Sequence, residues 1–212
     1  MAYEILPADN TAKGSINDDK MYRNITEKWR WGGLDAVKSE KDIYLDETVR
    51  RMVASHRQAV LDLAMNMAAN AIDARVAGND KAVDEFAAKA DTLIALQAAK
   101  LPVAAVDYSM LEVLQLSELY IRLYQATGNQ KYLDEGLALT ESSLVRFGQY
   151  LKYYQSLSPM LHSTLSNSDR IVEAYYRNLL QNYNDMGGNI EKMGDRLQLE
   201  MGIDLRPYLK NS

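Results

Sequence analysis

In the stretches GNDKAVDEF (Gly78–Phe86) and GNQKYLDEG (Gly128–Gly136), five residue types recur in register at an offset of 50 residues. A third glycine–asparagine pair stands at Gly188-Asn189. Glycine readily adopts the left-handed conformation that ends a helix, and asparagine is a favourable N-cap for the next helix. Each pair therefore predicts a helix hairpin, and the repetition indicates a helical-repeat fold.

Apolar residues spaced alternately by three and four predict long helices on both sides of these pairs. The first helix should run from Asp46, as its N-cap, to about Ala77. Its apolar stripe consists of Val49, Val53, His56, Val60, Leu63 and Met67. Its polar face should carry Arg50, Arg51, Arg57, Asp62 and Asn66. The spacing of Ser109 and Glu112 is that of a capping box, which predicts another helix over about 108–126.

The same periodicity predicts helices over about 80–100 and 130–157, a further one from Ser168, and a shorter one after Gly187-Gly188. No strand-like alternation extends beyond a few residues, so we expect an all-α fold. We expect tetratricopeptide-like stacked antiparallel hairpins, because short connections place consecutive helices antiparallel and neighbouring hairpins can share a core. The expected organisation is an irregular N-terminal arm packed on the helices (1–45) and a helical-repeat domain (46–212) with hairpins at about 46–101, 107–157 and 168–201.

Composition places the chain among ordinary globular proteins. It has 212 residues, of which 47 % are hydrophobic and 25 % charged, enough to bury a core. The formal net charge of −5 argues against nucleic-acid binding, because an acidic surface repels phosphates. The chain has no cysteine, which excludes disulfides, thiolate metal sites and cysteine nucleophiles.

The sequence also bears on membrane association. No stretch approaches the roughly 18–20 uninterrupted apolar residues that span a bilayer, so we expect no direct membrane insertion of this segment. The beginning, MAYEILPADN, lacks the basic-then-apolar pattern of a signal peptide. Residues Tyr3 to Pro7 have the character of an extended segment, and we expect the chain to be a piece of a longer polypeptide.

Candidate catalytic residues each have a structural interpretation that we favour. The pairs Asp84-Glu85 and Asp134-Glu135 recur in the first turns of corresponding helices, where negative charge interacts favourably with the helix dipole. His56 belongs to an apolar stripe and should be a hydrogen-bonded core residue, whereas His162 lies in a predicted loop. Without cysteine or an HExxH spacing, and without a phosphate-binding glycine loop, we expect no metal, cofactor or catalytic residue.

The most unusual surface candidate is Trp29-Arg30-Trp31, which contains both tryptophans of the chain. It could be an aromatic anchor for a partner or ligand, since tryptophan and arginine are frequent at interaction hot spots. Alternatively, it could be a hydrophobic contact that holds the arm on the helices, which is the interpretation we favour. Our candidate partner-binding residues are Trp29, Trp31 and Tyr44, the last of which opens a YLDE segment.

Several segments resemble a bacterial group of large multi-spanning membrane proteins of unknown function, whose membrane half is compared with protein O-mannosyltransferases. The resemblance covers most of the chain, less so the third hairpin. It is carried by MYRNITEKWRWGG (21–33), IYLDETVRRM (43–52), DKAVDEF (80–86), DYSML (107–111) and YLKYYQSL (150–157). Gly136 departs from the pattern, since repeats of this kind usually place alanine there. None of these motifs is catalytic.

The resemblance implies a soluble C-terminal domain at the periplasmic face of the inner membrane, with any glycosyltransferase chemistry in the missing membrane half. The expected function is a non-catalytic interaction module that binds a protein, its own membrane half, or a glycan or glycosylated acceptor. Two alternatives remain open at this point. One is a carbohydrate-binding or carbohydrate-active domain that uses aromatic stacking and carboxylates, and the other is a structural spacer or dimerisation element.

Overall fold

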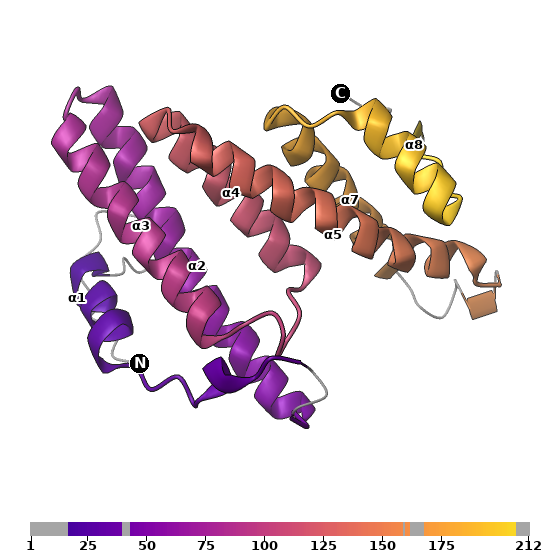
Figure 1. The fold of residues 1–212 in the computed structure, drawn as a ribbon, viewed down its shortest axis with the longest axis horizontal. Coiled ribbons are helices and arrows are strands. Elements are labelled where there is room, and N and C mark those ends of the chain that lie inside the picture. Colours follow the sequence, from indigo (N-terminus) through magenta and orange to yellow (C-terminus); the bar gives the residue numbers. More distant parts are fainter. Residues whose placement is uncertain (1–16, 40–42, 159, 162–167, 207–212) are drawn as a thin grey trace. The chain divides into compact units, whose positions relative to one another are not determined.

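The described part of the chain consists mainly of α-helices, with one π-helix and one 3-10 helix near its start (Figure 1). The structure, a computed structural model, describes residues 17–39, 43–158, 160, 161 and 168–206. No strand occurs among these residues, which confirms the expected all-α class. The described residues divide into two compact units, unit 1 up to Asp107 and unit 2 from Tyr108 onward.

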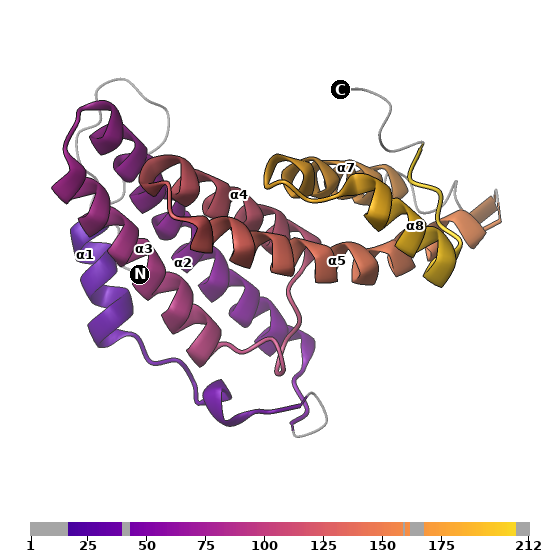
Figure 2. The same cartoon turned by 45° about the horizontal axis from the view of Figure 1, so that its top comes forward.

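Unit 1 contains the arm and the first hairpin. The arm begins with α1 (Asp18–Arg23), which continues as the π-helix η1 (Asn24–Lys28) and is followed by the short 3-10 helix η2 (Leu34–Ala36). The hairpin consists of α2 (Glu47–Val76) and α3 (Asp80–Lys100), which run antiparallel in both views (Figure 2). Ile25 of η1 is fully buried, so the arm contributes to the core of unit 1.

The glycine–asparagine turns have the predicted geometry. Gly78 and Gly128 adopt the left-handed conformation, with φ of +71° and +69°. The side chain of Asn79 accepts a hydrogen bond from the Ala82 backbone N–H at 3.2 Å and so caps α3. In the third pair the left-handed residue is Gly187, one position earlier than in the others. A turn that combines a glycine helix end with an asparagine cap explains why hairpins form at all three places.

Arg57 of α2 is buried, whereas the sequence placed it on the polar face, and that expectation is wrong. Its side chain is 0 % exposed. Its Nη2 donates to the backbone carbonyls of Leu101 and Val106, at 2.8 and 2.7 Å. Further hydrogen bonds reach the carbonyls of Pro102, from Nη2 at 3.4 Å, and Asp107, from Nη1 at 3.3 Å. The loop after α3 turns its apolar side chains inward, so its carbonyl groups need a buried donor, and Arg57 provides it.

Replacing Arg57 by methionine should therefore destabilise unit 1. The substitution leaves several buried carbonyls without a donor, and we expect a loss of about 3 kcal/mol or more in the free energy of unfolding. Both tryptophans lie in unit 1, so urea denaturation followed by tryptophan emission measures the effect. The matched control, Arg51→Met on the exposed side of α2, should change stability by no more than about 0.5 kcal/mol. Equal effects of the two substitutions would contradict this role.

Unit 2 contains the second hairpin and the two last helices. The hairpin pairs α4 (Met110–Thr127) with α5 (Gln130–Ser156), and the later helices are α7 (Ser168–Asp185) and α8 (Ile190–Met201). Helix α7 packs against both α4 and α5, while α8 contacts α5 more than α7. The third helix pair is therefore a looser hairpin than the first two.

The ends of these helices are fixed by local hydrogen bonds. The capping box predicted for α4 is present, because Ser109 and Glu112 exchange both side-chain-to-backbone bonds, at 2.7 and 3.2 Å. The segment that follows α8 packs against the core of unit 2. Ile203 and Leu205 are buried in the core of unit 2, so its first residues are docked, while residues 207–212 lie outside the described part.

Buried polar contacts fix the position of α7 in unit 2. The hydroxyl of Tyr176, fully buried, donates to the Leu144 carbonyl of α5 at 3.1 Å. The amide nitrogen of Asn182 donates to the hydroxyl of Ser117 on α4 at 2.7 Å. Because buried polar groups are costly when unpaired, these two bonds favour one rotational setting of α7. Within the described chain, no helix is long and apolar enough to cross a membrane.

Gly136 allows the close approach of three helices. A Cβ atom at this position of α5 would overlap the Met186 sulfur and lie 3.1 Å from the Cβ of Tyr120. These close contacts account for a glycine at this position. By contrast, a Cβ at Gly194 of α8 would have only an ordinary contact, 3.8 Å from a Leu205 methyl.

Replacing each of the two glycines by alanine should consequently change the free energy of unfolding in opposite directions. At Gly136, overpacking of about 1–3 kcal/mol should exceed the gain of about 1 kcal/mol in helix propensity, giving a net loss near 1 kcal/mol. At Gly194 the propensity gain should act alone and stabilise unit 2 by about 0.5–1 kcal/mol. Chemical denaturation followed by far-UV circular dichroism measures both. A stabilised Gly136→Ala variant would show that the three helices are not in tight contact.

Candidate functional site

A salt-bridged cluster connects the start of the arm to the hairpin of unit 1. The Lys89 ammonium of α3 lies 3.3 Å from the Asp19 carboxylate of α1 and 3.0 Å from Glu85. It also lies over the rings of Tyr22 and Phe86, 5.9 and 5.7 Å from their centroids. The hydrogen bond to Glu85 raises the pKa of Lys89 above its ordinary value, and the bond to Asp19 adds to this effect. The acidic pair Asp18-Asp19 thus connects α1 to the hairpin, whereas the N-cap of α1 is Asn17.

A second contact holds the end of the arm. Leu34 of η2 is buried against Leu45 and Val53 in an apolar cluster that Trp31 covers. Beside it, the Lys100 ammonium at the end of α3 lies 2.7 Å from the Asp35 carboxylate. This ion pair between the arm and α3 lies at the protein surface, with both side chains more than one third exposed.

Trp29 and Trp31 lie at this second contact. Their ring centroids are 5.3 Å apart, and the ring of Trp29 meets the imidazole of His56 edge-on at 5.2 Å. Both indoles are half-buried, so each also presents surface to solvent. The geometry is compatible with both sequence interpretations, since the same two rings hold the arm and leave an aromatic surface exposed.

His56 is hydrogen-bonded, as expected, but it is half-buried and does not lie in the core. Its Nδ1 lies 2.7 Å from the Met52 carbonyl oxygen. A carbonyl only accepts, so Nδ1 carries the proton and Nε2 is the remaining polar atom of the ring. His162 lies outside the described residues. Among those that are described, no cluster of three or more His, Cys, Asp or Glu residues could hold a metal ion.

A groove of about 320 Å³ opens where the arm meets the first turns of α2. Its lining is mostly apolar and comes from the arm, the start of α2 and the end of α3. The lining residues are Arg30, Trp31, Gly32, Leu34, Ile43, Leu45, Val49, Met52, Val53, His56 and Leu101. Such a mostly apolar hollow with a few polar groups is the usual form of a binding site.

The three candidate partner-binding residues occupy different positions relative to this groove. Trp31 lines it directly, whereas Trp29 is not a lining residue but contacts the rings of the lining residues Trp31 and His56. Tyr44 is 91 % exposed and stands between the lining residues Ile43 and Leu45. Sequence reasoning missed Met52, which is 54 % exposed on the rim. A usable signal existed, because Met52 is an apolar residue that lies outside the inward stripe of its helix.

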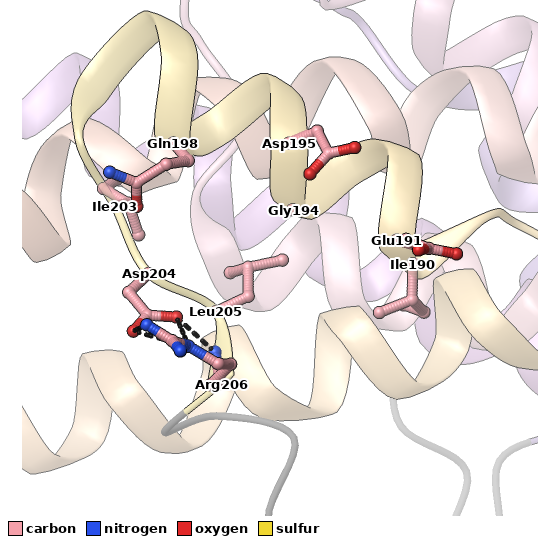
Figure 3. Close-up of a pocket in the computed structure, with 9 residues that line it drawn as sticks. All are labelled: Ile190, Glu191, Gly194, Asp195, Gln198, Ile203, Asp204, Leu205 and Arg206. Atoms are coloured by element: carbon pink, nitrogen blue, oxygen red, sulfur yellow. Dashed lines mark hydrogen bonds and ion pairs between the residues drawn. The ribbon is translucent and has the colours of Figure 1, made fainter.

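A larger hollow, of about 630 Å³, lies in unit 2 between α8 and the segment that follows it (Figure 3). Glu191 and Asp195 project from α8 on its border, and Asp204 and Arg206 face each other through short side-chain hydrogen bonds of 2.7–2.9 Å. The bond to Asp204 raises the pKa of Arg206. Because Asp204 and Arg206 neutralise each other, the net charge of the border comes from Glu191 and Asp195 and is negative.

The acidic pairs that a hydrolytic mechanism would need are exposed. Asp84, Glu85, Asp134 and Glu135 all face solvent in the first turns of α3 and α5. Glu85 forms an ion pair with Lys89 one turn later, and Glu135 forms one with Lys131 one turn earlier. An acid–base pair needs one carboxyl in a desolvated setting that raises its pKa, so the geometry argues for a structural role of these residues.

Comparison with known protein families, with curated proteins and with solved structures gave no match for this chain.

The ion pair between Asp35 and Lys100 should make docking of the arm sensitive to acid. The hydrogen bond from Lys100 holds the pKa of Asp35 below its ordinary value. Stabilisation from a lowered carboxyl pKa is present above the unfolded value, near 4, and is lost as pH falls through the folded pKa. We expect Asp35→Asn to be less stable than the native chain at pH 7, with a difference that shrinks as the pH is lowered below about 4. Urea denaturation across this pH range, followed by tryptophan emission, checks this. A difference that does not shrink on acidification would exclude the ion pair as its cause.

Proposed function

We propose that this chain is a non-catalytic helical-repeat interaction module that binds a segment of a partner protein in the groove between the arm and α2. The observation that carries the proposal is the groove itself, whose buried apolar floor is bordered by the half-exposed ring of Trp31 and the exposed side chain of Met52. Aromatic and methionine side chains around an apolar centre are typical of interaction sites.

The repeated hairpins support a scaffold role. Asparagine-capped, glycine-ended turns recur three times, and each hairpin presents an apolar face that needs a neighbour. We propose tetratricopeptide-like stacking of these hairpins as the arrangement of the module. Scaffolds of this kind present rigid surfaces, on which a binding groove keeps its shape before the partner arrives.

The resemblance to multi-spanning bacterial membrane proteins supplies the biological setting of the proposal. In that setting the chain is the soluble C-terminal domain at the periplasmic face of the inner membrane. Its partner is then a protein, the membrane half of the same polypeptide, or a glycosylated acceptor. Any transferase chemistry belongs to the membrane half, because the four paired carboxylates Asp84, Glu85, Asp134 and Glu135 lie exposed at helix starts.

One observation favours carbohydrate binding as a second candidate. Tyr150 and Tyr153 near the end of α5 are both more than half exposed, and Tyr150 stacks on Phe147 with ring centroids 6.0 Å apart. Exposed tyrosine rings present flat apolar faces with a polar edge, on which sugar rings can stack. This surface lies in unit 2, so substitutions at Tyr150 and Met52 distinguish the two candidates.

Binding by the groove should depend on Met52 and not on a comparable exposed residue elsewhere on the same helix. Met52→Gln makes the rim polar without altering the buried floor, whereas Val76→Gln changes a residue that is 83 % exposed at the far end of α2. We expect Met52→Gln to weaken saturable binding of the membrane half, or of a captured periplasmic protein, about five- to tenfold. Val76→Gln should have no effect.

The measurement is titration of the purified partner against each immobilised variant. Equal affinity of the Met52→Gln and native chains would place the interaction away from the groove. Failure of any protein to bind saturably would count against the interaction function as a whole.

A further inference from the structure

We infer that the occupant of the groove is an extended peptide segment of a partner protein that carries one or two aliphatic side chains next to an acidic residue. This inference rests on the proposed function and adds the chemistry of the partner. Three properties of the groove carry it, namely its apolar floor, its size and the sign of its charge.

The floor selects aliphatic side chains. Leu45, Val53 and Leu101 are buried beneath the groove and present only hydrocarbon. Ile43 and Met52 stand at its edge and are exposed, so a side chain that enters between them and Trp31 removes apolar surface from water on both partners. A sugar would leave its hydroxyl groups without hydrogen-bond partners against such a floor.

The size selects an extended segment. A volume of about 320 Å³ is at the lower end of the range for ligand sites, which suits one or two side chains. A whole helix is roughly 10–12 Å across and would need a longer trough. The Nε2 atom of His56 on the groove wall can accept a hydrogen bond from a peptide N–H when the ring is neutral, which suits a backbone lying along the groove.

The charge at the groove selects an acidic neighbour. Arg30 is the only Lys, Arg, Asp or Glu among the lining residues. It is exposed, and it forms no ion pair with another described residue. Among the described carboxylates near the groove, Asp35 pairs with Lys100 and Glu47 with Arg51. The chain as a whole has a net charge of −5, so this positive edge is a local exception that favours a carboxylate on the partner.

A lipid surface fits these observations less well than a peptide. Binding to anionic membranes uses clusters of about four to eight cationic side chains, whereas Arg30 stands alone among the charged residues of the groove. The groove is also sized for single side chains, and it does not present the broad apolar face with which a protein lies on a membrane.

Three synthetic peptides test the inference with the intact chain. They have the sequence Gly-Ser-Leu-Leu-X-Ser-Gly, in which X is glutamate, glutamine or lysine. Both tryptophans lie at the groove, so their emission reports occupancy, and calorimetry gives the dissociation constants. We expect the glutamate peptide to bind about two- to fivefold more tightly than the glutamine peptide and the lysine peptide to bind most weakly, which is the usual size of an exposed charge pair.

Charge reversal at Arg30 supplies the decisive comparison. Arg30→Glu should reverse the order of the glutamate and lysine peptides, while Arg75→Gln, on an exposed arginine at the far end of α2, should leave the order unchanged. Met52→Gln should weaken all three peptides together, because it changes the apolar rim and not the charge.

The outcomes separate this inference from the proposed function. Equal binding of the three peptides, still weakened by Met52→Gln, overturns the acidic preference and leaves the groove as the binding site. Absence of binding by any peptide, with partner capture still dependent on Met52, overturns the peptide chemistry alone. Light scattering that shows self-association abolished by Met52→Gln would identify a second copy of the chain as the occupant and overturn the inference.

Discussion

Unit 1 depends on a cation in its interior. The loop between α3 and α4 buries the apolar side chains of Leu101, Ala105 and Val106, and in doing so carries its own carbonyl groups away from water. Arg57 reaches these carbonyls from the middle of α2. A planar guanidinium has several donors in a fixed arrangement, so one side chain can serve carbonyls from both ends of the loop. The cost of burying its charge is offset only while the loop keeps its shape, so helix and loop stabilise each other.

This interaction also determines where the groove can lie. Leu101 contributes to the groove floor and accepts a hydrogen bond from Arg57 through its carbonyl. One turn before Arg57, Val53 lines the same floor, and Trp31 of the arm covers it. Arg57 and the groove therefore lie on opposite sides of the same layer of residues, which includes Val53 and Leu101. The proposed binding in the groove should therefore depend on the rigidity that the hydrogen bonds of Arg57 provide on the other side of this layer.

Most of the fold followed from local rules in the sequence. The capping box at Ser109, the N-cap at Asp46 and the glycine–asparagine turns rest on short-range hydrogen bonds, and all three were predicted. The burial of Arg57 was not predicted, although it shares one helix face with Val53 and Val60, because arginine is rarely buried without a visible partner. Its partners are backbone carbonyls, which have no sequence signature. Trp31 was recognised as a candidate from its residue type alone, whereas the signal for Met52, an apolar residue outside the inward stripe of its helix, was weaker and was missed.

The π-helix at Asn24–Lys28 contains one residue more than a regular helical turn would need, and its last bond joins the Trp29 N–H to the Asn24 carbonyl at 2.9 Å. Such a bulge corresponds to the insertion of one residue into a helix. The helical residues before it keep their contacts, while the residues after it are rotated about the helix axis. Deleting a single residue here would restore ordinary helical phase and turn the indoles by about 100° about the helix axis. Trp29 would then leave His56, so the gain or loss of one codon would reshape the groove that we propose as a binding site in a single step.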